Sequence, residues 1–128
     1  MNDDLRTPLN EIIATAEGLL TDKNSLLNDQ QQQDVQAIFK SAKRLLDLVG
    51  NVPNLDQNSE QIKSFSHETR VLLNNIIGFS SFWRNELPPI FGTLTAAQMD
   101  SMRKIHNNGI ALFYLVNALI ARYNPGDD

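Results

Sequence analysis

The sequence contains no cysteine and no long hydrophobic run. The absence of cysteine excludes disulfide bonds, cysteine-ligated zinc and thiol nucleophiles, and it fits a reducing compartment. No apolar stretch approaches the roughly 18 to 20 residues that span a bilayer, and the first residues do not form a signal peptide. The sequence therefore predicts a cytoplasmic protein with no membrane partner.

Basic residues are also few. The chain has 11 Lys and Arg against 15 Asp and Glu, a net charge of -4, and the basic residues are scattered along it. Proteins that bind nucleic acid gather their positive charge into patches that meet the phosphate backbone. We therefore expect no nucleic-acid partner.

The sequence does contain enough apolar residues to form one hydrophobic core. The 128 residues are 41% hydrophobic and 20% charged, which suits a single domain covering 1–128. Apolar residues recur at helical spacing over 3–21, 29–50, 58–86 and 96–122. Because the loops between these segments are short, neighbouring helices should be antiparallel. The predicted fold class is all-α, an antiparallel four-helix bundle.

Helix ends and core positions can be placed from residue types. Asn28 or Asp29 can cap the second helix, and Thr95 with Gln98 fits a capping box before the fourth. Periodicity assigns these positions to the core: Ile62, Phe65, Leu72, Leu73, Ile76 and Trp83 on the third helix, and Met102, Ile105, Leu112, Val116 and Leu119 on the fourth.

The chain also contains an internal repeat. Residues 3–13 and 67–77 align at an offset of 64, with matching Arg, Leu and Asn positions and coincident Ile-Ile pairs. Residues 38–49 and 105–116 align at an offset of 67. A repeat of this length predicts two helical hairpins that bury their apolar faces against each other. We place the first hairpin at 1–52 and the second, with His67, at 58–124.

His67 is predicted to lie on an exposed face of the third helix. At 100° per residue it lies roughly 140 to 180° away from the core positions of that helix. Val71, Asn74, Gly78 and Phe82 fall within about 60° of it, so the strip includes exposed apolar side chains, as docking surfaces do. An imidazole nitrogen can take a phosphoryl group, and the neighbouring Glu68 could orient the ring or accept its other proton. The simpler interpretation is an ordinary surface histidine.

Both copies resemble the dimerisation and phosphoacceptor domain of bacterial sensor histidine kinases, whose first helix carries the motif His-(Asp/Glu)-Leu-Arg-Thr-Pro-Leu. Residues 4–10, Asp-Leu-Arg-Thr-Pro-Leu-Asn, match it almost letter for letter, but Asp3 stands where the histidine belongs. Residues 67–70, His-Glu-Thr-Arg, restore the histidine and depart from the motif afterwards. In the kinases two chains each contribute one hairpin, so the resemblance implies an intramolecular pseudodimer that is a monomer in solution.

The resemblance implies two-component signalling, with His67 as the phosphoacceptor and Glu68 as its adjacent acid. Arg70, Val71, Asn74, Gly78 and Phe82 would then contact a response regulator receiver domain or a histidine kinase. The sequence has no Gly-rich phosphate loop, so this chain is not expected to bind ATP or phosphorylate itself. It needs no metal or cofactor of its own, because Mg²⁺ would come with the receiver.

Two other interpretations stay open. The chain could be a non-catalytic regulator or scaffold that binds the same partners without phosphotransfer, or one piece of a larger sensor. Val71 occupies the place where the family has a threonine associated with dephosphorylating the receiver, which argues against that activity here. His106, beside core Ile105 and without ligand partners at suitable spacing, is interpreted as a boundary residue.

Overall fold

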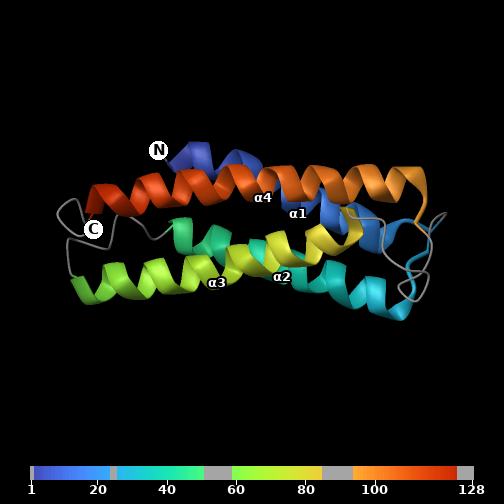
Figure 1. Ribbon diagram of the computed structural model, residues 1–128, viewed down its shortest axis with the longest axis horizontal. Helices are drawn as coiled ribbons and strands as arrows, with labels where there is room; N and C mark the ends of the chain where they lie inside the picture. The colour runs from blue at the N-terminus through green and yellow to red at the C-terminus, as the bar shows by residue number, and fades with distance from the viewer. Residues whose placement is uncertain (1, 24–25, 51–58, 85–93, 124–128) are drawn as a thin grey trace.

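The computed structural model describes residues 2–23, 26–50, 59–84 and 94–123, although the side chains of 2–3, 59, 82–84 and 123 lie outside the described part. These residues form four helices, α1 (Asn2–Thr21), α2 (Asp29–Gly50), α3 (Ser59–Arg84) and α4 (Ala96–Tyr123) (Figure 1). The predicted helix positions are confirmed over the described residues, and the predicted helix residues 58, 85 and 86 lie outside them. No helix in these ranges is long and apolar enough to cross a membrane.

The helices form an antiparallel four-helix bundle, as predicted. α1 packs against α2 and α4, and α3 packs against the same two helices, so that α1 and α3 lie on one diagonal and α2 and α4 on the other. Figure 1 shows the four helices running along the same long axis. A ring of this kind gives every helix two close neighbours around a shared core.

Two capping boxes start α2 and α4 in the same way. The Asn28 side chain accepts a hydrogen bond from the Gln31 amide at 2.8 Å, and the Gln31 side chain accepts one from the Asn28 amide at 2.9 Å. Thr95 and Gln98 exchange the same pair of bonds at 3.0 and 2.9 Å. Each box satisfies two backbone amides that a helix start leaves without a partner. The Thr95 box is the predicted one, and Asn28 rather than Asp29 caps α2.

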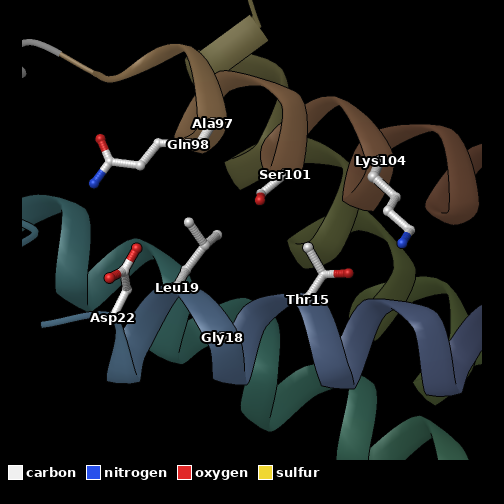
Figure 2. Close-up of a pocket in the computed structure, with 8 residues that line it drawn as sticks. All are labelled: Thr15, Gly18, Leu19, Asp22, Ala97, Gln98, Ser101 and Lys104. Atoms are coloured by element: carbon white, nitrogen blue, oxygen red, sulfur yellow. The ribbon is translucent and has the colours of Figure 1, made fainter. Parts of the chain in front are cut away.

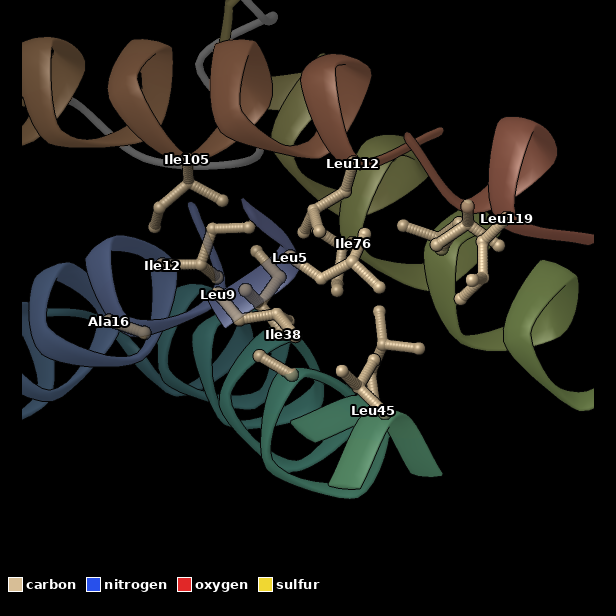
Figure 3. Packing of buried hydrophobic residues seen from close by; sticks show 14 of the residues in the cluster. Leu5, Leu9, Ile12, Ala16, Ile38, Leu45, Ile76, Ile105, Leu112 and Leu119 are labelled. Carbon is tan, nitrogen blue, oxygen red and sulfur yellow. The ribbon is translucent and has the colours of Figure 1, made fainter. Parts of the chain in front are cut away.

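All four helices contribute side chains to one hydrophobic core (Figure 3). Its members on the first hairpin are Leu5, Leu9, Ile12, Ala16, Leu19, Val35, Ile38, Ala42, Leu45 and Val49, and on the second Ile62, Phe65, Leu73, Ile76, Met102, Ile105, Leu112, Val116 and Leu119. The predicted core positions on α4 are all confirmed. On α3, Leu72 is only half-buried, and the Trp83 side chain lies outside the described part.

Burial repeats between the hairpins at the offsets of the sequence repeat. We call two positions counterparts when they are 64 residues apart on α1 and α3, or 67 apart on α2 and α4. Ten counterpart pairs are buried in both hairpins: Leu5 and Thr69, Leu9 and Leu73, Ile12 and Ile76, Ala16 and Ser80, Gln31 and Gln98, Val35 and Met102, Ile38 and Ile105, Ala42 and Gly109, Leu45 and Leu112, and Val49 and Val116. The capping boxes are counterparts too. The two hairpins therefore present the same pattern of side chains to the core.

Candidate functional site

The outward face of α3 carries His67. The side chain is exposed in the third turn from the described start of the helix, whereas the side chains of Phe65, Thr69 and Leu73 on the same helix are buried. This alternation follows from the helical period, because residues two positions away lie on the far side of the helix. The predicted exposure of His67 is confirmed, and the imidazole is open to a macromolecular partner.

Glu68 is held by an arginine of the first hairpin. Arg44 Nε on α2 donates to Glu68 Oε2 at 2.8 Å, and Arg44 Nη2 donates to Oε1 at 3.3 Å, so the pair is bidentate. The hydrogen bond to Glu68 and the attraction of its charge raise the pKa of Arg44. Both carboxylate oxygens of Glu68 are thus directed towards Arg44, and the ion pair joins the two hairpins beside the histidine.

The remaining predicted residues follow His67 along α3. Arg70, Val71 and Asn74 are exposed, and Val71 keeps 45% of its surface accessible. Gly78 is half-buried, with open space where a side chain would start. The Phe82 side chain lies outside the described part. The described members of the predicted set therefore share one outward strip with His67.

The first hairpin has different exposed side chains at the counterpart positions. Asp4, Arg6, Thr7 and Asn10 are exposed on α1, where the second hairpin has Glu68, Arg70, Val71 and Asn74. The side chain of Asp3, the counterpart of His67, lies outside the described part. The outward strip of α3 thus has a counterpart on α1. In the first hairpin, however, Asp3 replaces His67 and Thr7 replaces Val71.

The interpretation of His106 as a boundary residue is wrong. Its side chain is 7% exposed, and its Nδ1 lies 3.2 Å from Ser80 Oγ and 3.3 Å from Ser81 Oγ. Both hydroxyls also bond backbone carbonyls, to Ile76 at 2.7 Å and Ile77 at 2.6 Å. Because the hydroxyl protons serve the carbonyls, a tautomer with the hydrogen on Nδ1 would let both Oγ atoms act as acceptors. Periodicity missed this cluster because its partners are polar residues from another helix.

The two histidines therefore differ in environment. His67 is exposed on α3, whereas His106 is buried and hydrogen-bonded between α3 and α4. Among the residues that the structure describes, no three His, Cys, Asp or Glu side chains gather where they could hold a metal ion. The chemistry open to this surface is that of a single accessible imidazole.

A shallow groove between α1 and α4 lies elsewhere on the bundle (Figure 2). Its volume is about 240 Å³, and it is lined by Thr15, Gly18, Leu19, Asp22, Ala97, Gln98, Ser101 and Lys104. Lys104 Nζ already pairs with Glu11 at 2.8 Å. Counting residues from the contact between Gly109 and Ile76 places the groove about 20 to 30 Å from His67 along the bundle axis. The groove is therefore separate from the outward face of α3 that carries His67.

One comparison with known proteins supports the resemblance seen in the sequence, for the first hairpin alone. Residues 1–56 match the family model of the His Kinase A (phospho-acceptor) domain. Neither a curated protein nor a solved structure matches the chain. The matched range contains no histidine, and His67 lies 11 residues beyond its end. The match supports a domain of the histidine kinase type in the first hairpin, and this type of domain indicates two-component signalling.

Proposed function

We propose that the chain is a histidine phosphotransfer module, in which His67 exchanges a phosphoryl group with an aspartate of a response regulator receiver domain. The observation that carries the proposal is the exposure of His67 at the counterpart position of Asp3, where the family motif has its histidine. The family match to the first hairpin and the repeated burial of the second support this assignment.

The reaction needs little from this chain beyond positioning. A neutral imidazole nitrogen of His67 would attack the phosphorus of an aspartyl phosphate, forming an N–P bond while the O–P bond breaks and the carboxylate leaves. Charge on the transferring group would be balanced by the Mg²⁺ of the receiver. Reversal of the same step would return the phosphoryl group to a receiver, so the module can relay in either direction.

Glu68 has a structural role in this proposal. Its bidentate pair with Arg44 fixes the side chain against α2, on the flank of α3 away from α4. Both carboxylate oxygens are therefore directed at Arg44, whose charge offsets the repulsion that the carboxylate would exert on an incoming phosphoryl group. The pair also forms a contact between the two hairpins one residue from the phosphoacceptor.

The second candidate is a regulator that binds a receiver or a kinase without chemistry. Val71 favours it, because an exposed valine stands in the turn after His67 at the place of a polar family residue. A valine offers a docking contact and cannot position a water. In this case the outward strip would bind the partner while His67 stayed unmodified.

Two phosphodonors test the proposal. Phosphoramidate, which phosphorylates imidazoles directly, should label exposed His67 and spare buried His106, so that intact mass shows one acid-labile group. A receiver domain from the source, charged with acetyl phosphate, should pass its label to the wild type. His67→Gln should abolish both labels while far-UV circular dichroism and receiver binding stay unchanged. Binding of the receiver without any transfer to the wild type would favour the non-catalytic regulator.

A further inference from the structure

The outer side of α4 carries an exposed apolar cluster, which we call the α4 patch: Ile110, Phe113 and Tyr114. Their exposed fractions are 37%, 38% and 69%. The Phe113 and Tyr114 rings meet edge to face, with centroids 5.6 Å apart. Aromatic side chains that stay accessible and pack on each other supply large contact area at little entropic cost, which is why they anchor interfaces.

The α4 patch lies on the same face as His67. Gly109 on α4 sits against Ile76 and Ile77, since a Cβ at Gly109 would lie 3.2 and 3.1 Å from their side chains. Because α3 and α4 are antiparallel neighbours, moving five residues on from Gly109 brings Tyr114 level with Val71. The patch thus lies about one to two helical turns from the level of His67, with Tyr114 at its nearer end.

The orientation of the patch agrees with this register. Phe113 is seven residues from His106, so the two lie about 20° apart around α4. His106 contacts Ser80 and Ser81, which places Phe113 on the α3 side of its helix. By the same spacing Arg70 lies on the α4 side of α3, seven residues before Ile77. His67, Arg70 and the α4 patch therefore lie on one side of the bundle, which we call the α3–α4 face.

The first hairpin has no such surface among its described residues. The counterparts of Ile110, Phe113 and Tyr114 are Lys43, Leu46 and Asp47, and the counterpart of Val71 is Thr7. Lys43 and Asp47 are exposed, Leu46 is half-buried, and the Lys43 ammonium lies 5.3 Å from the Phe39 ring, over the core edge. The corresponding α1–α2 face is consequently charged.

Net charge differs between the hairpins as well. Residues 59–123 carry six Lys or Arg and four Asp or Glu, a net charge of +2. Residues 1–50 carry five Lys or Arg and eight Asp or Glu, a net charge of -3. An acidic partner would be attracted to the second hairpin and repelled by the first.

We propose that this module has a single docking face, the α3–α4 face, and binds one receiver domain per chain through the α4 patch. The inference rests on the proposed function for the identity of the partner. A receiver presents acidic side chains around its phosphorylated aspartate, which suits the positive hairpin, whereas the α1–α2 face replaces the apolar α4 patch with Lys43, Leu46 and Asp47. A symmetric dimer of hairpins would have two equal faces and bind two receivers.

The test is the stoichiometry of binding, measured by isothermal titration calorimetry with receiver domains encoded beside the chain in its genome. We expect one receiver per chain. Tyr114→Glu should weaken binding at least 10-fold and slow transfer to His67, because a carboxylate on this face repels the acidic partner. The matched variant Lys43→Glu puts a carboxylate on the α1–α2 face at the counterpart of Ile110, and it should leave affinity within 2-fold. Phosphoramidate labelling of His67 should be the same in both variants.

Other results would overturn the inference. These are two receivers per chain, or equal loss of affinity in the Tyr114 and Lys43 variants. A wild-type dimer by light scattering that Tyr114→Glu makes monomeric would show that a second copy covers the patch. One-to-one binding that Tyr114→Glu disrupts, without transfer to His67, would refute the phosphotransfer function and leave the docking face standing. No binding to any of these receivers would refute both.

Discussion

Gly78 and Gly109, which lie in the helices of the second hairpin, should respond differently to the same substitution. Gly78→Ala adds a methyl group in the interior of α3, where nothing lies within 4 Å of the new Cβ. Alanine is favoured over glycine in a helix interior by about 1 kcal/mol. We expect this variant to gain about 1 kcal/mol in unfolding free energy and about 3 to 5 °C in melting temperature.

Gly109→Ala gains the same helix propensity but meets side chains. Its Cβ would lie 3.1 Å from Ile77 Cγ1 and 3.2 Å from Ile76 Cγ2, and Ile76 is fully buried. Relieving such contacts in a packed core costs about 1 to 3 kcal/mol. The net effect is a loss of about 0 to 2 kcal/mol, which leaves the two variants about 1 to 3 kcal/mol apart.

Urea denaturation followed by far-UV circular dichroism measures both variants against the wild type. The comparison tests the spacing of α3 and α4, which sets where the α4 patch lies relative to His67. Equal stabilisation by the two substitutions would mean that Gly109 does not approach α3 closely. The alignment of α3 with α4, from which we placed the α4 patch near His67, would then be wrong. A destabilised Gly78 variant would instead contradict the open space beside α3.

Two further predictions concern stability. Leu73→Ala removes a 1% exposed core side chain, so the unfolding free energy should fall by about 2 to 5 kcal/mol, and a loss below 1 kcal/mol in urea titration would contradict its place in the core. Ser80→Ala or Ser81→Ala alone should cost little, because the other hydroxyl still accepts from His106, whereas the double variant should cost about 1 to 3 kcal/mol more than the sum. Additive losses in a double-mutant cycle would show that the two serines act independently.

Helix positions could be predicted from the sequence because the periodic apolar pattern agreed with the residues that start and end helices. The start of α4 illustrates this, since Thr95 and Gln98 form the expected box. Pro8 is a harder case: it lies inside α1, where it removes one backbone donor, and yet the helix continues through it. Buried Leu5, Leu9 and Ile12 on either side of the proline hold both turns against the core.

What could not be predicted was polar contact between helices. The wheel placed His67 outward correctly, but no local pattern pairs Glu68 with Arg44, which is 24 residues away on another helix. His106 was missed for the same reason. Its partners Ser80 and Ser81 are 26 and 25 residues distant, and each also bonds its own helix backbone. Such contacts depend on the register between helices, which side-chain periodicity leaves open.

The contacts between the hairpins also bear on why two such different faces can coexist in one bundle. In a dimer of identical hairpins, any change that makes one face apolar makes the other apolar too. Among the residues that the structure describes, the ion pairs between the hairpins are not repeated: Arg44 pairs with Glu68, and Lys104 with Glu11, while the counterparts of Arg44 and Lys104 are Ala111 and Ala37. These ion pairs do not follow the repeat, although the buried positions do. If the chain carries two fused copies, as the repeat suggests, fusion would free one copy to keep the scaffold and the other to specialise in docking. On that view the first hairpin keeps the residues of the family motif that follow the histidine, and the second hairpin keeps the histidine itself.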